Sequence, residues 1–414
     1  MKAIIVGGGI GGLTTALMLR ARGIDCELFE QSDIIRELGV GINTLPHAIR
    51  ELAGLGLLQK LDDVAIRTDV LYYLNRHGQE VWKESRGIDA GHDVPQFSIH
   101  RGRLQSVIHR AVEERLGKDA IHTGCRLGAF TQDEGGVSAH FFDRAGSHTQ
   151  TVRGDILIGA DGIYSKVRET LFPDEGPPCW NGLMLWRGAR DWPLFLTGRS
   201  MIVAGGLNAK VVVYPIAEGS SPANRLTNWA VLVKIGDGGA PPRREDWSRL
   251  GKREELMPHV ARFSVPYVDV PALISATPEF YEFPTCDRDP LPYWSSGRVT
   301  LLGDAAHPMY PVGSNGASQA ILDARALADA LARSEHPRQA LVAYEQKRLP
   351  MTAEIVRSNR RGGPEGVIDA VEQLAPDGFD DIERVLSHAQ REAIVRGYAS
   401  KAGFAAVPLA AVRA

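Results

Sequence analysis

Cysteine is scarce in this chain, and the few that occur form no cluster. The four cysteines among 414 residues stand far apart and make no CxxC pair, and the histidines are not grouped either. Disulfide-framed domains and zinc sites both need such clusters. We therefore expect neither a disulfide framework nor a bound metal, and we expect the reducing cytoplasm as the compartment.

Long apolar runs and a one-sided charge are also missing. The N-terminus reaches glycine after a few apolar residues, and no later segment has the length that a membrane-spanning helix requires. The 47 basic and 50 acidic side chains leave a net charge of −3, which gives no electrostatic reason to bind nucleic acid or an anionic membrane. We expect a soluble cytoplasmic protein without nucleic-acid or membrane partners.

What is present is an ordinary globular composition. Hydrophobic residues make up 44% of the chain and charged residues 23%, which excludes disordered, collagen-like and coiled-coil architectures. A chain of 414 residues predicts two domains, or one large domain with insertions.

The first thirty residues carry the clearest pattern. Residues 2–6 form a short apolar run typical of a buried strand, and the spacing GxGxxG follows at once in residues 7–12. Residues 13–22 have helical periodicity and are followed by Gly23. Residues 24–29 then predict a second strand. The order is that of a βαβ dinucleotide-binding unit.

Each conspicuous residue of this unit has a separate task. Gly7 suits the tight turn, Gly9 lets the backbone approach a pyrophosphate, and Gly12 permits close packing of helix on strand. Glu30, at the end of the second strand, can accept hydrogen bonds from a ribose hydroxyl. A glycine-rich turn without a ligand is the alternative for the motif by itself, and the motif does not distinguish NAD from FAD.

In two later segments, an expected buried strand is likewise followed by an aspartate. Residues 156–168 bring Asp161 to a glycine-containing turn, and residues 299–308 do the same for Asp304. Ligands of open α/β sheets bind at the carboxyl ends of such strands. The second segment continues into a helix that we expect over residues 320–332.

These three segments together resemble the single-component, FAD-dependent aromatic hydroxylase family (the group A flavoprotein monooxygenases), which includes salicylate and para-hydroxybenzoate hydroxylases. The resemblance covers residues 1–350 and rests on three motifs in the family's order. Three further segments are similar to the branch that contains phenazine-1-carboxylate monooxygenases: residues 39–43, 98–105 and 287–292.

The resemblance implies an α/β fold with a Rossmann-like FAD-binding domain of the para-hydroxybenzoate hydroxylase type. The domain would consist of residues 1–70, 97–174 and 284–345. An inserted antiparallel-sheet substrate domain would take residues 71–96 and 175–283, where strand-like stretches alternate with turns. Residues 346–414 are expected to form a helical C-terminal tail, whose role the sequence does not disclose.

The resemblance also implies a set of cofactor-binding residues. Asp304 matches the aspartate that hydrogen-bonds the ribityl chain of FAD, Arg101 the arginine on the far side of the cleft, and Gln105 a glutamine near the ribityl–phosphate region. Asp161 belongs to a motif used for both FAD and NAD(P)H; the alternative is an aspartate that only caps its turn. The full expected set is Gly7, Gly9, Ile10, Gly11, Gly12, Glu30, Gln31, Val40, Gly41, Arg101, Gln105, Asp161, Gly303, Asp304, Pro311, Gly313, Asn315 and Gly316.

The segment after Asp304 also has a physical reason to face a flavin. Reduced flavin carries negative charge around N1 and the C2 carbonyl, and a helix that begins near Asn315 and Gly316 offers N–H donors and a positive dipole end. Glycines at 313 and 316 would let the backbone reach the ring edge without a Cβ in the way.

Substrate contacts are harder to infer. Trp186, Arg187 and Tyr214 lie on expected strands of the substrate domain, and Met309 would lie against the flavin. An arginine beside aromatic residues can hold a planar carboxylated ring by an ion pair and by stacking. The alternative is that Trp186 and Tyr214 are core residues and that Arg187 forms a structural salt bridge.

The implied activity is that of a monooxygenase: NADH or NADPH reduces FAD, O2 adds to give a flavin C4a-hydroperoxide, and one oxygen atom passes to an aromatic or heteroaromatic, carboxylated or phenolic small molecule. No general base identifies itself in the sequence. Epoxidation or Baeyer–Villiger oxidation of a non-aromatic substrate, a nicotinamide-dependent dehydrogenase and a non-catalytic flavoprotein are the alternatives. A monomer or a homodimer would be usual for the family.

Overall fold

The computed structural model describes residues 1–35, 40–243, 246 and 248–405. Gly39, which belongs to one of the segments similar to the phenazine branch, lies outside the described residues.

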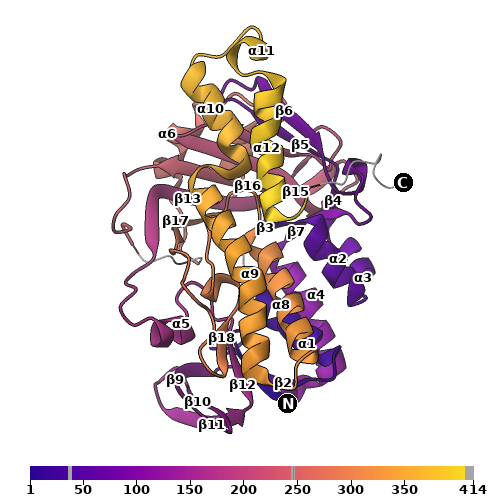
Figure 1. Ribbon diagram of the computed structural model, residues 1–414. Helices are drawn as coiled ribbons and strands as arrows, with labels where there is room; N and C mark the ends of the chain where they lie inside the picture. Colours follow the sequence, from indigo (N-terminus) through magenta and orange to yellow (C-terminus); the bar gives the residue numbers. More distant parts are fainter. Residues whose placement is uncertain (36–39, 244–245, 247, 406–414) are drawn as a thin grey trace, which may run out of the picture.

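A five-stranded parallel sheet forms the centre of the lower half of the molecule in Figure 1. Its first strand, β1, pairs with β2 on one side and β12 on the other. Ile4 and Ile5 in β1 are fully buried, because helices cover one face of the sheet and the strands of residues 126–154 cover the other. The strand order is β18 (Val299–Leu301), β12 (Ile156–Gly159), β1 (Lys2–Val6), β2 (Asp25–Phe29) and β8 (Ile121–His122).

Helices α1 (Ile10–Arg20), α4 (Arg101–Leu116) and α8 (Gly316–Ala332) pack together beside this sheet. The predicted strand–helix–strand unit is present, and α1 starts three residues earlier than its periodicity indicates. The helix begins earlier because Ile10 is already buried against the core. Gly11 and Gly12 adopt the helical conformation and extend the first turn toward the cavity.

A small antiparallel sheet, which was not predicted from the sequence, lies at the bottom of Figure 1. It consists of β9 (Arg126–Asp133), β10 (Gly136–Phe142) and β11 (His148–Gly154). Val137, Ala139 and Phe141 alternate along β10 and are fully buried, which is the pattern of a sheet with one face in the core.

A seven-stranded sheet forms the upper half. The antiparallel pairing expected from the sequence is present throughout this sheet except at one place, where β14 runs parallel to β5. There β5 and β6, which come from residues 70–85 and precede the other strands by about a hundred residues, join the edge of the sheet. The order is β17 (Tyr281–Asp287), β13 (Cys179–Pro193), β16 (Asn224–Lys234), β15 (Ala209–Glu218), β14 (Met201–Gly205), β5 (Val70–Leu74) and β6 (Glu80–Ser85).

The two faces of this sheet have different neighbours. Helices α6 (Arg253–Val260) and α7 (Val270–Ser275) cover one face with a buried apolar cluster that includes Trp229. The other face turns toward the parallel sheet and toward α10 (Gly366–Leu374). Between the two large sheets lies a third, with β3 (Gly41–Thr44), β7 (Gln96–His100) and β4 (Ile66–Thr68).

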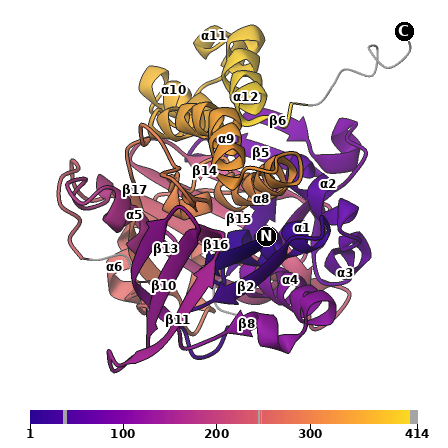
Figure 2. The same cartoon turned by 60° about the horizontal axis from the view of Figure 1, so that its bottom comes forward.

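The C-terminal part of the chain is helical, as expected, and it runs along the whole molecule. Helix α9 (Pro337–Arg360) packs against α8, and α12 (His388–Ala402) contacts α9 and lies beside α10 at the top of Figures 1 and 2. A capping box between Ser387 and Gln390 starts α12, and Gly403 in a left-handed conformation ends it. The short α11 spans Ile382–Val385.

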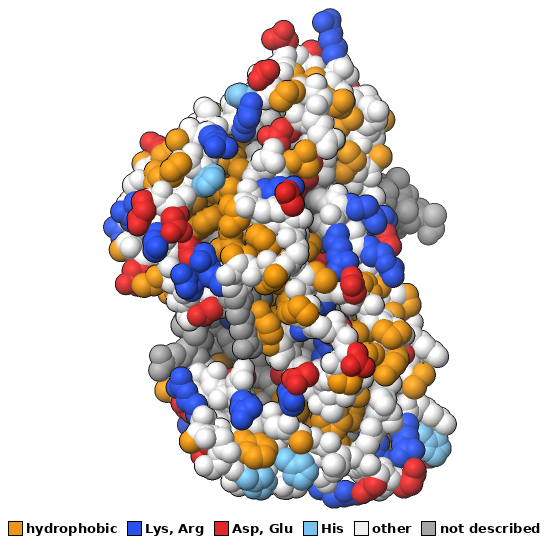
Figure 3. Space-filling model, turned by 90° about the vertical axis from the view of Figure 1, so that its left-hand side faces the viewer, with side chains coloured by type: hydrophobic (Ala, Val, Ile, Leu, Met, Phe, Trp, Pro, Cys, Tyr) orange, Lys and Arg blue, Asp and Glu red, His pale blue; other side chains and the backbone are white. Residues whose placement is uncertain are grey.

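The surface is mixed in character. Basic and acidic side chains are interspersed on the face in Figure 3, and hydrophobic side chains gather near its middle. Of the helices that the structure describes, none combines the length and the apolar character needed to cross a bilayer.

Candidate active site

A cavity of about 880 Å³ opens between the parallel sheet, the seven-stranded sheet and the start of α8. This is at the upper end of the volumes usual for small-molecule sites. Its walls come from segments that lie far apart in the sequence. The glycine loop after β1 lines one end, and strands β13 to β17 line the other.

The glycine loop shows why each glycine is needed. A Cβ on Gly12 would lie 1.9 Å from the carbonyl oxygen of Gly7, and Gly7 itself has a φ of +110°. A Cβ on Gly9, by contrast, would meet no described atom within 4 Å, and Gly9 lines the cavity. The loop is therefore closed on its inner side and open toward the cavity, where the first N–H groups of α1 lack intrahelical acceptors.

Glu30 is held beside this loop at the end of β2. One carboxylate oxygen accepts a hydrogen bond from the backbone N–H of Gly8 at 2.7 Å, and the other accepts one from Ser32 at 2.8 Å. Gln105 supports the same loop from α4, since its Nε2 donates to the carbonyl oxygen of Gly8 at 2.8 Å. Glu30 lines the cavity, whereas Gln105 is buried behind the loop.

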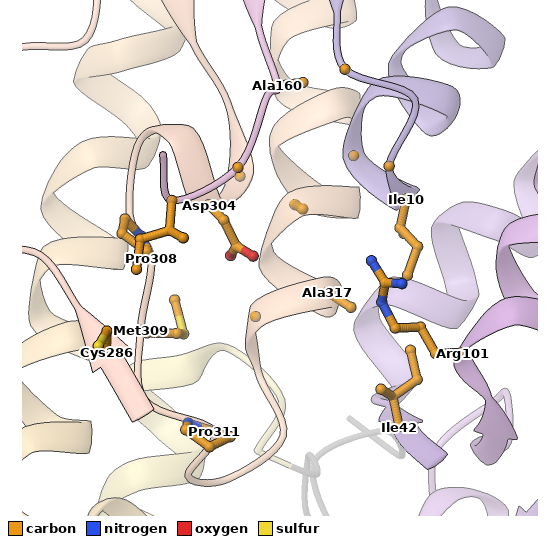
Figure 4. A pocket seen from close by; sticks show the side chains of 18 of the residues that line it. Ile10, Ile42, Arg101, Ala160, Cys286, Asp304, Pro308, Met309, Pro311 and Ala317 are labelled. Atoms are coloured by element: carbon orange, nitrogen blue, oxygen red, sulfur yellow. The ribbon is translucent and has the colours of Figure 1, made fainter. Parts of the chain in front are cut away.

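Arg101 and Asp304 lie on opposite sides of the cavity, as Figure 4 shows. Burial lowers the pKa of Arg101, and the charge of Asp304 raises it. Burial likewise raises the pKa of Asp304, and the charges of His307 and Arg101 oppose this shift. Asp304 is exposed within the open cavity, so its carboxylate is accessible to a ligand. The two groups thus place a positive and a negative charge on opposite walls in the middle of the cavity.

Asp161 is engaged in capping. Its two carboxylate oxygens accept hydrogen bonds from the Ser165 hydroxyl at 2.5 Å and from the Lys166 N–H at 2.7 Å, at the start of α5 (Lys166–Leu171). Burial raises the pKa of this carboxyl, and the hydrogen bonds lower it. The aspartate also lines the cavity, so the capping role and a role in binding are compatible.

His307 belongs to a buried network behind the cavity. Its Nε2 lies 2.5 Å from the carboxylate of Asp323, which also accepts a hydrogen bond from Arg348 at 2.7 Å and from the Gly303 N–H at 3.1 Å. Burial raises the pKa of Asp323, but the charges and hydrogen bonds of His307 and Arg348 outweigh it and hold the pKa at about 2. The network fixes the turn that presents Asp304.

One face of the seven-stranded sheet forms the wall at the other end. Successive side chains on a strand point to opposite faces, so Leu185 and Arg187 of β13 face the cavity while Trp186 does not. The sequence prediction that Trp186 contacts substrate is therefore wrong: its Nε1 donates to Glu282 at 3.0 Å on the far face, within the core formed with α6 and α7.

Arg187 and Tyr214 are the polar residues of this wall that the sequence predicted. Burial lowers the pKa of Arg187 to about 10, and burial raises the pKa of Tyr214 to about 12 against the nearby charge of Arg187. An Nη of Arg187 reaches the carbonyl oxygen of Gly41 at 3.5 Å, and Asn228 accepts a hydrogen bond from the Gly41 N–H at 2.8 Å. Their surroundings are mostly apolar: Leu185, Met201, Val212, Ala230, Leu232 and Phe283.

The structure brings most of the predicted site residues to one cavity. The lining includes Gly7, Gly9, Ile10, Gly11, Glu30, Gln31, Gly41, Arg101, Asp161, Gly303, Asp304, Pro311, Asn315, Gly316, Arg187, Tyr214 and Met309. Four other predicted residues lie behind it. Gly12 and Gln105 support the glycine loop, Val40 accepts a hydrogen bond from the Arg101 N–H, and Gly313 packs against Tyr398.

Several residues that line the cavity were not predicted from the sequence. Asn228 could have been found, because it shares its strand face with Ala230 and Leu232. Glu365 follows α9, and no pattern in the sequence connects it with the cavity. It is buried in an ion pair with Lys210, which also pairs with Asp369 at 2.9 Å. Burial raises the pKa of Glu365, and the charge of Lys210 opposes the rise.

Comparison of the chain with known proteins identifies its family and supports its fold. Residues 1–359 match the family described as "FAD binding domain". The chain is 43% identical over 362 residues to a phenazine 1,6-dicarboxylic acid hydroxylase of Lysobacter antibioticus, an alignment that covers 86% of this chain and 88% of that protein. It is 32% identical over 377 residues to a 3-hydroxybenzoate 6-hydroxylase of Klebsiella oxytoca, with 88% of each chain covered.

Solved structures agree on the fold. The crystal structure of Klebsiella pneumoniae HpxO complexed with FAD and uric acid matches with a TM-score of 0.76 at 23% identity, over 99% of this chain and 98% of that one. A salicylate hydroxylase substrate complex matches with a TM-score of 0.74 at 22% identity, over 98% of each chain. The predicted α/β fold with a helical C-terminal region is confirmed.

Proposed function

Because the chain belongs to the family of FAD-dependent aromatic hydroxylases, we propose that it hydroxylates a heteroaromatic carboxylic acid and that Arg187 binds the carboxylate. When bound, FAD takes a hydride from NADH or NADPH and activates O2 for transfer of one oxygen atom. The protein binds and orients the two reactants and keeps water away from them.

The residues around the cavity fit the cofactor. The space in front of Gly9, which a Cβ would fill, and the open N–H groups of α1 suit a pyrophosphate. Glu30, already held by two backbone N–H groups, is suited to a ribose hydroxyl. Arg101 and Asp304 offer a donor and an acceptor from opposite sides. We assign the cofactor to this part of the cavity.

The observation that carries the substrate proposal is the placement of Arg187. It is a half-buried cation on a wall that is otherwise mostly apolar, beside the hydroxyl-bearing Tyr214. Apolar side chains suit a flat ring, and the guanidinium fork matches a carboxylate in two parallel hydrogen bonds. The relative that hydroxylates phenazine 1,6-dicarboxylic acid supports this class, since its named substrate is a flat, carboxylated heteroaromatic.

The proposal predicts a selective effect of substituting Arg187. In Arg187→Ala, we expect the dissociation constant for phenazine-1-carboxylate to rise by about 100-fold, since a charged hydrogen-bonded pair contributes about 3 kcal/mol. Phenazine without a carboxylate should bind to the variant as it binds to the wild type. Titration of the purified FAD-loaded protein, followed by flavin absorbance, measures both constants.

Arg187→Lys is the matched control, because it keeps the charge and loses the fork. We expect it to recover only part of the affinity. Equal binding of the carboxylate by all three proteins would contradict the assignment. Oxidation of NADH and of NADPH with O2, with product masses recorded, then tests the reaction itself: a gain of one oxygen atom is expected, and peroxide without oxygenated product would contradict hydroxylation of that compound.

A further inference from the structure

The loop of residues 309–316 lines the cavity before α8, and segments from the end of α9 onward hold it in place. Asn359 donates to the carbonyl oxygen of Tyr310 at 3.1 Å, and Glu365 accepts from the N–H of Gly313 at 3.4 Å. The match to the FAD-binding family ends at residue 359. Part of the support for this cavity wall, including Glu365, thus comes from a region outside the family match.

Tyr398 on α12 makes the central contacts of this support. It is 3% exposed, and its hydroxyl accepts a hydrogen bond from the Asn315 side-chain amide at 2.9 Å. The same hydroxyl donates to the carbonyl oxygen of Val312 at 3.4 Å. Gly313 lies directly on the ring, because a Cβ there would be 2.6 Å from Tyr398. The loop and α12 therefore pack without space between them.

These contacts determine what the side chain of Asn315 can do. Asn315 occupies the N-cap position of α8, where an asparagine side chain commonly accepts a hydrogen bond from the helix's first N–H groups. Here it makes no such cap among the described residues. Its Nδ2 donates to Tyr398, and its Oδ1 accepts from Gln319 at 3.1 Å. The first N–H groups of α8 remain open, and Gly316 and Ala317 line the cavity.

We propose that Tyr398 is a positioning residue for the cofactor: by holding the Asn315 amide, it keeps the N-terminus of α8 available to FAD. Reduced FAD is anionic, and the positive end of a helix favours it over the oxidised form. Without the Tyr398 hydroxyl, the Asn315 amide keeps only Gln319 as a partner, and its side chain can turn to cap α8 itself. The cap would then compete with the cofactor for the same N–H groups. The inference rests on FAD binding and is independent of the substrate proposed above.

The test compares two tyrosines that are alike except for the group they hold. Tyr344 on α9 is fully buried and donates to the carbonyl oxygen of Leu301, within the parallel sheet. Tyr398→Phe and Tyr344→Phe each remove one buried hydroxyl. We expect FAD to bind about tenfold more weakly to Tyr398→Phe and with unchanged affinity to Tyr344→Phe, measured by the quenching of flavin fluorescence.

The reduction potential separates positioning from a general structural effect. Tyr398→Phe should have a lower flavin reduction potential, by about 30 mV for each tenfold loss of affinity for reduced over oxidised FAD. Wild-type affinity and potential in Tyr398→Phe would overturn the proposal, and so would weaker FAD binding with an unchanged potential.

Hydrogen exchange on the unsubstituted protein gives an answer even if Tyr398→Phe does not fold. FAD should slow exchange in residues 388–402 as well as in residues 309–317, because the two segments are joined. Protection by FAD of residues 309–317 alone would show that α12 does not support the cofactor site, and would overturn the proposal.

Discussion

Gly9 and Gly12 stand three residues apart in one motif, yet they have opposite surroundings. A Cβ on Gly12 would overlap the backbone oxygen of Gly7, and backbone cannot move aside as a flexible side chain can. We therefore expect Gly12→Ala to lower the free energy of unfolding of the FAD-free protein by about 3 kcal/mol or more, as for severe overpacking. Urea denaturation followed by circular dichroism measures the change.

Gly9→Ala is the matched comparison. Its methyl group has open space within the protein, and the φ of Gly9 is −74°, which any residue adopts. The FAD-free protein should therefore keep its stability, while the dissociation constant for FAD rises at least tenfold because the methyl group enters the cofactor's space. If Gly9→Ala instead destabilised the FAD-free protein as much as Gly12→Ala, the cavity-facing role of Gly9 would be wrong.

The difference between Trp186 and Arg187 shows what the sequence could supply at this scale. Both lie on a predicted strand, and neighbouring side chains on a strand point to opposite faces. Only one of the two can therefore face the cavity. The sequence contains no signal for which side, because β13 carries apolar residues on both faces: Met184 is fully buried in one cluster and Leu185 is 4% exposed in another. The packing of α6 and α7 against one face of the sheet determines that Trp186 lies in the core and that Arg187 faces the cavity.

At the scale of elements, the motif-bearing strands and helices were predictable because short-range chemistry specifies them. The strand, glycine turn and helix of residues 2–20 follow from local pattern, as do the strands that deliver Asp161 and Asp304. The parallel pairing of β5 with β14 was not predictable, since it joins two segments with no local relation. The contact of α12 with the loop of residues 309–316 was not predictable for the same reason.

Helices α2 (Pro46–Gly54), α8 and α9 meet at a histidine whose charge state links their packing to pH. His47 on α2 is 7% exposed, and its Nε2 lies 3.4 Å from Gln319 of α8. Burial lowers the pKa of His47 to about 3, and the positive charges of Arg348 and Arg50 add to the effect. The imidazole therefore stays neutral in the folded protein well below the usual pKa of a histidine.

This predicts a loss of stability on acidification. Below the unfolded-state pKa of about 6.5, the unfolded chain binds a proton at His47 that the folded chain refuses down to a pKa of about 3. Stability therefore falls as the pH drops through this window, by about 2 kcal/mol from this group between pH 7 and pH 5. His47→Gln should show a correspondingly shallower decline in urea denaturation. Parallel pH profiles for the two proteins would contradict the prediction.

At the scale of the whole molecule, the cavity is where the separately built parts meet. The glycine loop and Glu30 belong to the parallel sheet, Arg187 and Tyr214 to the seven-stranded sheet, and Glu365 to the C-terminal region. The parallel sheet has one apolar core and the seven-stranded sheet has another, and a third cluster joins the seven-stranded sheet to α10 and α12. A ligand that fills the cavity therefore contacts all three parts, whereas each apolar core joins at most two of them.

FAD should consequently stabilise the molecule as one unit. A ligand that binds only the folded state adds about 2.7 kcal/mol to the free energy of unfolding at a free concentration of 100 times its dissociation constant. We expect this increment in a single transition that tryptophan fluorescence and flavin fluorescence report together. Trp186 and Trp229 belong to the core of the seven-stranded sheet, away from the glycine loop, so the tryptophan signal includes that part. Two transitions, with FAD shifting only the one that releases flavin, would show that the seven-stranded sheet unfolds independently of the cofactor.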